Sequence, residues 1–483
     1  MTNFSLLAAS LLNLVNNQAG TLVSHFENVL GTSLTLKIKA DNQFMAEIAE
    51  KQIIDYVKQL QNNLGSFTEG QGLYDFNRSI GSQTVNNDLK DLMIEFDHWN
   101  VKTNGAINSQ TNSLKNIWLN AEINQTIPTD EILASAVSEI SNKPWIIDNN
   151  YVTKLAKNDI RLHSLAKGFV LEKAAEFALN INGVTGISMN IGGDILLKGD
   201  MSEFVKISDP LNSEENSNFL GVVELKNQAI ASSGNYKDGF DINGVHYSHI
   251  FDPKTGYPVD QIVGSSVIHE NAITAGAIAT AANVLTPLET EKLVNTIGGV
   301  EYLVTEKDGN IITSANWNAK PENETSTISF VNVKEKSWNP NLVLQINLEL
   351  ADLGGYARRP YVAIWVEDEN HKPVRRLAVW YRKPRWLPEL REFSNSLRDD
   401  NMDVYSITSA TRSAGQYNLV WDGKNDQGEF VPQGNYTVFI ESAREHGPYE
   451  LMKQVVKCDD KLKSVSYTPN GEISSASLVL KNK

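Results

Sequence analysis

Residues 248–259 read SHIFDPKTGYPV and combine a turn with two side chains that a turn does not need. Pro253 and Gly256 are residues that tight turns favour, so the segment is typical of a hairpin or loop. His249 and Asp252 lie three residues apart beside that turn. An imidazole next to a carboxylate can serve as a base with its orienting group and activate a hydroxyl. A purely structural turn and a catalytic loop therefore both remain open for this stretch.

The next segment, ENAITAGAIATAANVL at residues 270–285, is made almost entirely of small and aliphatic residues. We expect a helix over residues 271–285, in which Gly276 and Thr280 share one face because they are four residues apart. Glycine weakens a helix interior, so its presence indicates either close contact with another backbone or a site next to a ligand. Close packing is the explanation that needs no ligand.

Three shorter motifs precede these two segments. They are SLAKGF at residues 164–169, NIGGD at residues 190–194 and SSGNY at residues 232–236. A lysine at a helix start favours anions, and consecutive glycines let backbone N–H groups approach a phosphate or a ring. Each motif alone is equally explained by an exposed cap, a bulge or an ordinary turn. The chain contains neither a GxGxxG dinucleotide fingerprint nor a GxxxxGK[ST] phosphate loop.

The composition is that of a globular protein, and its 483 residues are enough for roughly two to four domains. A net charge of −15 argues against a nucleic-acid partner, because such binding needs a basic face. Residues 331–483 carry 21 Lys and Arg against 20 Asp and Glu, so the excess of acids lies before residue 331. The single cysteine, Cys458, excludes an internal disulfide and a cysteine metal cluster. No apolar run reaches about 18 residues, so we expect no membrane span.

Hydrophobic periodicity divides the chain into a mixed region and an all-β region. Helices are expected over residues 42–64, 86–99, 129–142, 167–180, 271–285 and 287–296, with antiparallel strands among them. This mixture predicts an α+β domain rather than a doubly wound one. Beyond a polar stretch at 315–330, six alternating segments separated by turns predict an antiparallel β-sandwich. We therefore expect domains over 23–325 and 330–483, preceded by residues 1–22 as a signal remnant or a first helix.

Taken in order, SLAKGF, NIGGD, SSGNY, HIFDPKTG and TAGAIATAA resemble five motifs of the ApbE family, the FAD:protein FMN transferases. LGTS at residues 30–33 and TNGAIN at residues 103–108 are looser matches, and the resemblance covers about residues 26–312. It implies a T-fold-like α+β domain that binds FAD, moves the FMN half to a Thr or Ser hydroxyl of a partner protein and releases AMP. It also implies a Mg²⁺ ion that bridges the pyrophosphate.

The resemblance further implies roles for individual residues. His249 would help to deprotonate the acceptor hydroxyl, and Asp252 would fix its loop. The Mg²⁺ ligands would map to the backbone carbonyl of Ser164, the hydroxyl of Thr280 and the position of Gly276. The residues expected to bind the flavin nucleotide are Ala106, Ile107, Asn108, Lys167, Asn190, Gly192, Gly193, Asp194, Ser233, Ile250 and Thr255.

Several positions depart from the family pattern where acids are expected. Gly276 stands in place of an Asp that would offer its carboxylate to the same ion as Thr280. Arg161 also replaces an Asp, Asn108 replaces a carboxylate, and the loop at residues 67–77 lacks a Ser–Glu pair. Two functions are compatible with these residues: a Mg²⁺-dependent FAD:protein FMN transferase, and a divergent FAD-binding protein without transfer because a metal ligand is replaced.

The C-terminal region resembles an uncharacterised exported β-sandwich family that recurs behind ApbE-like domains, on motifs that include RRPYVAIWVED and RWLPELREF. This implies an extracytoplasmic, periplasmic location, with or without membrane association. TSAT at residues 408–411 is similar to the motif that ApbE enzymes modify, so Thr411 is a candidate flavin acceptor, and a polar turn is the alternative. The expected partners are FAD and an acceptor protein with a TSAT- or SGAT-type motif, including this chain's own C-terminal domain.

Overall fold

The computed structural model describes residues 20–211, 219–234, 239–319, 337–354, 358–382, 384–397, 408–445 and 447–483. The chain falls into two compact units. Unit 1 consists mainly of Asn28–Val205 and Val223–Ala319, and unit 2 consists mainly of Lys320–Lys483, together with Val23–Glu27 and Lys206–Val222. Most of the expected N-terminal segment 1–22 and much of the expected polar stretch before residue 330 lie outside the described residues.

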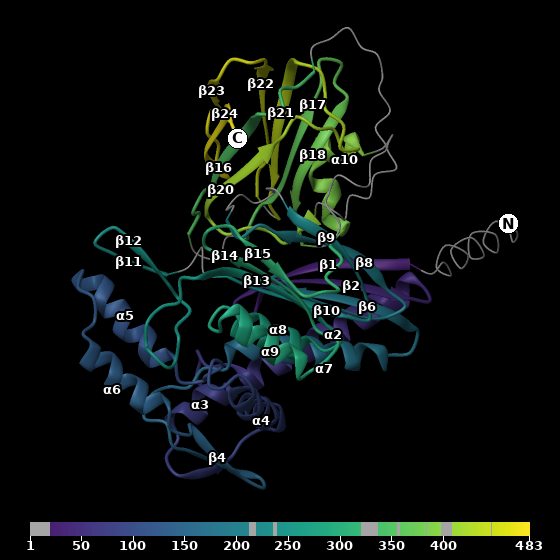
Figure 1. Ribbon diagram of the computed structural model, residues 1–483. Coiled ribbons are helices and arrows are strands. Elements are labelled where there is room, and N and C mark those ends of the chain that lie inside the picture. The colour runs from purple at the N-terminus through teal and green to yellow at the C-terminus, as the bar shows by residue number, and fades with distance from the viewer. Residues whose placement is uncertain are drawn as a thin grey trace, which may run out of the picture. The chain divides into compact units, whose positions relative to one another are not determined.

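Unit 1 is built on an eight-stranded sheet with the order β1-β2-β6-β7-β10-β13-β14-β15 (Figure 1). Its strands are β1 (Gly20–Val29), β2 (Thr32–Ala40), β6 (Val184–Ile191), β7 (Asp194–Gly199), β10 (Ala229–Gly234), β13 (Ile262–His269), β14 (Glu301–Glu306) and β15 (Ile311–Thr313). All pairings from β2–β6 to β14–β15 are antiparallel. In β2 the alternate residues Leu34, Leu36 and Ile38 are buried, which is the period-two pattern that predicts a strand with one core face.

Helices α2 (Gln43–Leu64), α7 (His163–Leu179) and α8 (Ala272–Ala282) lie along one face of this sheet (Figure 1). Helix α2 is amphipathic, and it begins after Asn42, whose side chain accepts the N–H of Met45 at 3.0 Å. Helices α7 and α8 pack against each other and against the sheet. Helix α8 is apolar almost all round, as a buried helix is, whereas α7 also carries Lys167, Glu172, Lys173 and Glu176. The α+β fold predicted for this part of the chain is confirmed.

The start of α8 is fixed on α7 by backbone contact. A Cβ atom added at Gly168 of α7 would lie 2.5 Å from the carbonyl oxygen of Ala272. Glu172, one turn further along α7, accepts the N–H of Ala272 at 2.5 Å. Asn271 caps α8 by accepting the N–H of Thr274 at 2.9 Å. Close approach of two backbones therefore explains the glycine of the SLAKGF motif.

The remaining elements of unit 1 are shorter. The helices are α3 (Gly72–Arg78), α4 (Asn87–Lys102), α5 (Asn112–Asn124), α6 (Asp130–Ile140) and α9 (Pro287–Asn295). The strands form a three-stranded sheet of β3 (Ser82–Thr84), β5 (Tyr151–Lys154) and β4 (Trp145–Asp148), and a hairpin of β11 (Gly239–Ile242) and β12 (Val245–Ser248). A further two-stranded sheet joins β8 (Ser202–Ser208) to β9 (Phe219–Lys226), and the division into units falls within both strands. The periodicity predicts α4, α6 and α9 but not α5.

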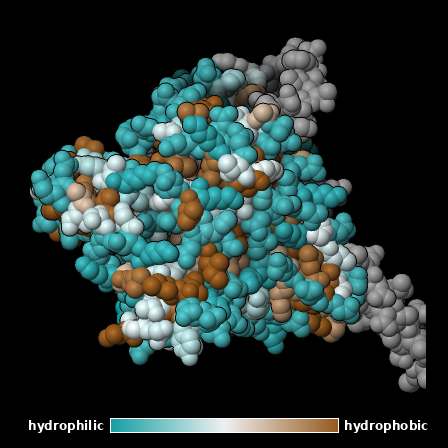
Figure 2. Space-filling model, turned by 60° about the horizontal axis from the view of Figure 1, so that its bottom comes forward, coloured by the Kyte–Doolittle hydropathy of each residue, from teal (hydrophilic) through white to brown (hydrophobic). Residues whose placement is uncertain are grey.

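The surface seen in Figure 2 is mainly hydrophilic, with apolar side chains in small separate patches. Exposed large apolar side chains include Phe67, Ile80 and Val101. Scattered residues of this kind are normal on a protein surface and do not identify a site. Within the described ranges, no helix has the length and hydropathy that crossing a membrane requires.

Unit 2 is a β-sandwich of two sheets, with the orders β20-β16-β24-β23 and β19-β18-β17-β21-β22. Its strands are β16 (Leu342–Leu350), β17 (Tyr361–Glu367), β18 (Pro373–Trp380), β19 (Thr408–Ser409), β20 (Gly415–Trp421), β21 (Gly434–Ala443), β22 (Tyr449–Cys458), β23 (Lys463–Ser466) and β24 (Ile473–Asn482). The short β19 runs parallel to β18, and the other pairings are antiparallel. The predicted all-β second domain is confirmed, with β19, β23 and β24 in addition to the six predicted strands.

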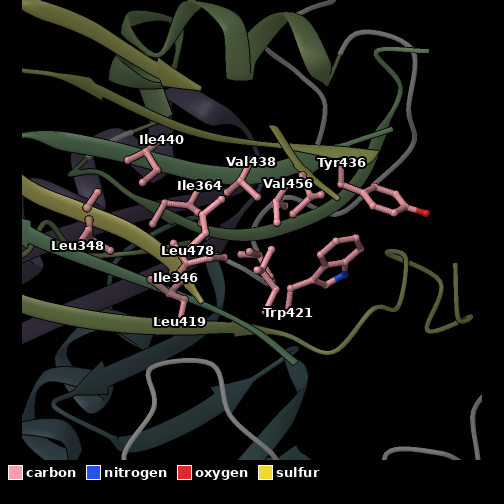
Figure 3. Close-up of a cluster of buried hydrophobic side chains, with 14 of the residues drawn as sticks. Ile346, Leu348, Ile364, Leu419, Trp421, Tyr436, Val438, Ile440, Val456 and Leu478 are labelled. Atoms are coloured by element: carbon pink, nitrogen blue, oxygen red, sulfur yellow. The ribbon is translucent and has the colours of Figure 1, made fainter. Parts of the chain in front are cut away.

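Apolar side chains from both sheets fill the space between them (Figure 3). The labelled residues are Ile346, Leu348, Ile364, Leu419, Trp421, Tyr436, Val438, Ile440, Val456 and Leu478. A second cluster lies on the opposite face of the five-stranded sheet, where Trp365 stacks on Phe439 and packs against Phe393 of α10 (Arg391–Ser396). The 3₁₀ helix η2 (Pro384–Glu389) precedes α10.

Candidate active site

A cavity of about 230 Å³ lies within unit 1, where the first turns of α7 meet the wall of α8 and the ends of β7 and β10. Every sequence motif singled out in the first 300 residues, apart from LGTS, contributes at least one residue to its lining. The lining consists of Ala106, Ile107, Asn108, Thr111, Arg161, His163, Ser164, Lys167, Asp194, Ala231, Ser232, Ser233, His249, Ile250, Phe251, Gly276, Ala279, Thr280 and Val284. Residues as far apart in the chain as Ala106 and Val284 therefore share one cavity.

Helix α7 begins at His163, four residues before the predicted start. The backbone N–H of Arg161 donates to the carbonyl of Ser109 at 2.8 Å, which ties the helix entrance to the lining segment 106–108. Ser164 and Lys167 therefore lie three residues apart on one face of the first helical turns, and both line the cavity. The SLAKGF motif lies at a helix start, as predicted, but all of its residues are helical rather than only those from Lys167 onward.

Lys167 forms an ion pair across the cavity wall. Its Nζ lies 3.6 Å from Oδ2 of Asp194 and 3.5 Å from the carbonyl oxygen of Gly192. Burial raises the pKa of Asp194, while Lys167 and the backbone N–H of Ser232 act in the opposite direction. The carboxylate therefore has two partners from other elements, Lys167 of α7 and the backbone N–H of Ser232 in β10.

The NIGGD motif forms the tight turn between β6 and β7. Gly192 and Gly193 have φ angles of 57° and 98°, in the region that favours glycine, and Asn190 accepts the N–H of Gly193 at 2.9 Å. Of the four motif residues predicted to bind the nucleotide, only Asp194 lines the cavity. Asn190, Gly192 and Gly193 shape the turn that presents Asp194 and Gly192's carbonyl to Lys167.

The segment from His249 to Gly256 supplies one side of the cavity. His249 and Ile250 line it, whereas Asp252 and Thr255 do not. Asp252 accepts the N–H of Lys254 at 2.9 Å and the hydroxyl of Thr255 at 3.1 Å, so its carboxylate closes the turn. Asp252 therefore stabilises the turn, and Thr255 lies in the same turn, outside the cavity lining.

Helix α5 anchors this turn from outside. Trp118 is fully buried, and its indole N–H donates to the carbonyl of Gly256 at 2.9 Å. Gly256 has a φ of 75° and faces Leu114 of the same helix. Helix α5, which the periodicity does not predict, therefore holds the His249–Gly256 segment in place.

The segment around Asn108 is held with equal rigidity. Ile107 donates its N–H to the hydroxyl of Thr103 at 3.0 Å. The side chain of Asn108 donates to the carbonyl of Ile140 at 3.0 Å and accepts the N–H of Gln110 at 2.8 Å. With both ends of its amide engaged, Asn108 contributes a fixed neutral wall to the cavity.

Gly276 leaves an opening in the wall of α8. A Cβ atom at this position would have one neighbour within 4 Å, the carbonyl oxygen of Ser164 at 3.9 Å. Thr280 lies one helical turn further along and also lines the cavity. Close packing, which explains Gly168, does not explain Gly276.

The oxygen atoms expected to bind Mg²⁺ are present, but no carboxylate accompanies them. Ser164 would contribute a carbonyl oxygen and Thr280 a hydroxyl, whereas Asp194, the one carboxylate in the lining, is paired with Lys167. Within the described parts of the chain, no three His, Cys, Asp or Glu side chains form a cluster suited to a metal ion. Because proteins usually hold Mg²⁺ through one or two carboxylates, these residues do not fit a Mg²⁺ site.

Sequence reasoning did not place Thr111, Arg161, His163 or Ser232 in the site. Arg161 donates from Nη1 to the hydroxyl of Ser66 at 2.7 Å. Desolvation, followed by the charge of Arg161, lowers the pKa of His163 to about 4, although part of this side chain is open to water. Arg161 and His163 lie within three residues of the start of SLAKGF. Their closeness to Lys167 at the start of a helix is the sequence signal that could have placed them in the site.

Thr411 lies in unit 2 and is buried, with 3% of its surface exposed. Its hydroxyl has no hydrogen-bond partner among the described residues. As folded, the side chain is therefore not presented to an enzyme. Residues 398–407, which precede this motif, lie outside the described residues.

Comparison with known proteins gives a family for each unit. Residues 30–304 match the ApbE family, and residues 343–475 match a family described as predicted periplasmic protein (DUF2271). The FAD:protein FMN transferase of Vibrio cholerae is 26% identical over 295 residues, which is 59% of this chain and 88% of that protein. The FAD:protein FMN transferase of Chlamydia muridarum is 29% identical over 269 residues, which is 53% of this chain and 80% of that protein.

Solved structures agree with these matches. The ApbE protein from Thermotoga maritima aligns with a TM-score of 0.53 and 25% identity over 62% of this chain and 97% of that chain. The flavin transferase ApbE from Vibrio cholerae aligns with a TM-score of 0.51 and 22% identity over 62% of this chain and 98% of that chain. This second likeness shows that the two proteins share a fold. The first family match covers more than half of the 483 residues and contains every segment that lines the cavity. This chain therefore belongs to the ApbE family.

Proposed function

We propose that this chain is an FAD:protein FMN transferase, which moves the FMN half of FAD to a Thr or Ser hydroxyl of an acceptor protein. The observation that carries the proposal is the lining of one cavity by His249, Lys167 and the open wall at Gly276. These residues offer a base for the acceptor hydroxyl, a cation for the diphosphate and unfilled space beside it.

The reaction is a phosphoryl transfer in which the protein mainly positions groups and offsets charge. The acceptor oxygen forms a bond to the phosphorus of the FMN half, and the bond from that phosphorus to the oxygen shared with AMP breaks. The imidazole of His249 takes the hydroxyl proton, and AMP leaves with the bridging oxygen and its electron pair. Lys167 offsets the charge of the diphosphate, and Asp252 keeps the loop of His249 closed.

The family resemblance implies a Mg²⁺ ion, but among the described residues the cavity lining supplies no free carboxylate to bind it. If the ion binds, its protein ligands would be the carbonyl oxygen of Ser164 and the hydroxyl of Thr280. We route no step of the reaction through it, since neither ligand carries a charge.

We further propose that the acceptor is a separate polypeptide with a TSAT- or SGAT-type motif. Burial of Thr411 supports this over modification of the chain's own C-terminal domain, because the hydroxyl would have to become exposed first. Incubation of the full chain with FAD, followed by its intact mass, separates the two. A mass increase by one FMN that disappears in Thr411→Val would instead establish Thr411 as the acceptor.

We place the chain outside the cytoplasm, since its second family is described as a predicted periplasmic protein. Membrane association is a separate proposal. Fractionation of cells that carry the chain would test it, with recovery in the membrane pellet after a high-salt wash as the supporting result.

The decisive experiment follows both products of the proposed reaction. Purified chain is incubated with FAD and an acceptor protein carrying a TSAT-type motif, and AMP release and covalent flavin on the acceptor are measured. We expect His249→Ala to slow transfer by about 10²- to 10⁴-fold while FAD still binds, because a general base contributes that much. His246→Ala is the matched control, since this histidine is exposed, pairs with Asp241 and lies outside the cavity lining.

FAD binding without AMP release or flavin transfer, under every ion condition, would refute the transferase and favour an FAD-binding protein. Equal rates for wild type and His249→Ala would remove the proposed base and leave the transferase itself standing.

A further inference from the structure

The charges that line the cavity differ from those of a metal-binding pocket. Arg161 and Lys167 are its cations, and Asp194 is its one carboxylate. Lys167 pairs with Asp194 at 3.6 Å, so only part of its charge is left to offset that of a bound diphosphate. The positions where the family resemblance implies further acids hold Gly276, Asn108 and Arg161 itself. The lining is therefore net positive, in the absence of any ion.

The contacts that hold Arg161 in place within the described ranges of the chain include no carboxylate. Its backbone N–H donates to the carbonyl of Ser109 at 2.8 Å, and its Nη1 donates to the hydroxyl of Ser66 at 2.7 Å. The guanidinium carbon lies 5.2 Å from the ring centre of Phe67. A hydroxyl and an aromatic ring orient a guanidinium but do not neutralise it, so the charge is available to an anion in the cavity.

The wall at Gly276 has room for such an anion. At Gly276 a Cβ atom would meet a single neighbour, the carbonyl oxygen of Ser164 at 3.9 Å. A carboxylate at this position would repel a bound phosphate unless a cation lay between the two groups. Glycine adds no negative charge, so no such cation is required. The gain of Arg161 and the loss of a carboxylate at Gly276 thus change the charge of the cavity in the same direction.

We propose that Arg161 neutralises the diphosphate of FAD in this cavity, in the part that the family resemblance gives to Mg²⁺, so that nucleotide binding needs no divalent cation. The inference rests on the proposed function, because it names the group that binds the substrate of that reaction. A guanidinium suits this part, since its planar N–H groups can donate in pairs to phosphate oxygens and its charge does not titrate. Charge neutralisation by a fixed arginine is an established means of stabilising phosphoryl transfer.

The test measures binding to the full chain rather than turnover. FAD, ADP and riboflavin are titrated by calorimetry in EDTA and again in excess Mg²⁺. If binding needs no metal ion, the FAD affinity of the wild type should agree within about twofold between EDTA and excess Mg²⁺. Arg161→Gln should weaken FAD and ADP by about ten- to a hundredfold, the range for a lost hydrogen bond to a charged group, and leave riboflavin unchanged.

Two further variants make the assignment specific. Arg161→Lys keeps the charge but not the paired donors, so it should recover part of the loss. Arg78→Gln is the matched control, since Arg78 is exposed, lies over the ring of Tyr74 at 3.6 Å and is not part of the lining. Gly276→Asp should weaken FAD binding in EDTA and recover it with Mg²⁺, because it restores a carboxylate beside the oxygen of Ser164.

The inference is overturned if the wild type loses tenfold or more of its FAD affinity in EDTA, or if Arg161→Gln binds FAD and ADP as the wild type does. The wild-type comparison decides the matter even if Arg161→Gln does not fold. Failure of the proposed function looks different: no FAD binding in either condition, or binding without transfer. FAD binding that requires Mg²⁺, followed by transfer, would contradict the proposed role of Arg161 and leave the proposed transferase function intact.

Discussion

Helices α7 and α8 each carry a glycine in their interior, and the two glycines have opposite surroundings. A Cβ atom at Gly168 would come 2.5 Å from the backbone oxygen of Ala272, whereas at Gly276 the nearest atom would be the oxygen of Ser164 at 3.9 Å. The first glycine is required by the contact of two helices. The second is required by no contact and leaves room where a side chain would fit. Gly168 is therefore explained by helix packing in α7, whereas Gly276 leaves unfilled space beside α8.

Gly168→Ala tests the packing side of this comparison and should have the largest effect. The added methyl group would meet backbone atoms that cannot rotate away, so we expect a loss of about 2–3 kcal/mol in the free energy of unfolding. Urea unfolding followed by the helical circular dichroism signal measures it. That signal reports unit 1, because the described helices of seven or more residues all lie there.

A loss below about 0.5 kcal/mol for Gly168→Ala would mean that α7 and α8 can separate without cost. The distinction between the two glycines would then collapse, since neither would be required by packing.

Asn271→Ala should have an intermediate effect and touches neither glycine. The variant removes the cap that accepts the N–H of Thr274 at 2.9 Å, which typically costs about 1 kcal/mol. The same urea experiment measures the loss, and Asn271→Ser should restore most of it because serine also caps helices. Weakened FAD binding in Asn271→Ala, at equal folded fraction, would show that the start of α8 and the cavity wall are not independent.

Gly276→Ala should have the smallest effect, and its sign is opposite. The methyl group would meet ordinary van der Waals space, and alanine favours a helix, so we expect a gain of about 0.5–1 kcal/mol in the free energy of unfolding. Paired urea titrations of Gly276→Ala and Gly168→Ala give the contrast directly. Destabilisation by Gly276→Ala would place an unseen packing partner at the cavity wall.

Much of the fold follows from local patterns in the sequence. The alternation in β2 and the apolar spacing in α2 are strong because each element has one buried face. Helix α5 lacks such a signal, since its burial rests on Leu114, Trp118 and Ala121 alone. Strand β24 is interrupted by serines, so its alternation is weak in the sequence. Elements whose burial depends on partners far along the chain are those that local periodicity does not reveal.

The candidate site follows from the sequence to a similar degree. Lys167, Asp194, His249 and Thr280 meet in the cavity, as the motifs predict. Asn190 and Thr255 do not, because a motif does not distinguish a residue that shapes a turn from one that touches a ligand. Arg161 escaped prediction as a binding residue because its charge matters only when the loop of Ser66 and the helix start are seen together.

The order of strands in unit 1 has a consequence for the way the chain folds. Strand β2 pairs with β6, where Thr35 lies opposite Asn190, and β7 pairs with β10, where Leu196 lies opposite Ala229. During synthesis β2 must therefore wait for about 150 further residues before its partner emerges, and the cavity cannot close until α8 has followed. Pairings over such distances form slowly. The arrival of a functional pocket is thus a late event, and recovery of flavin binding on refolding would time the completion of the sheet.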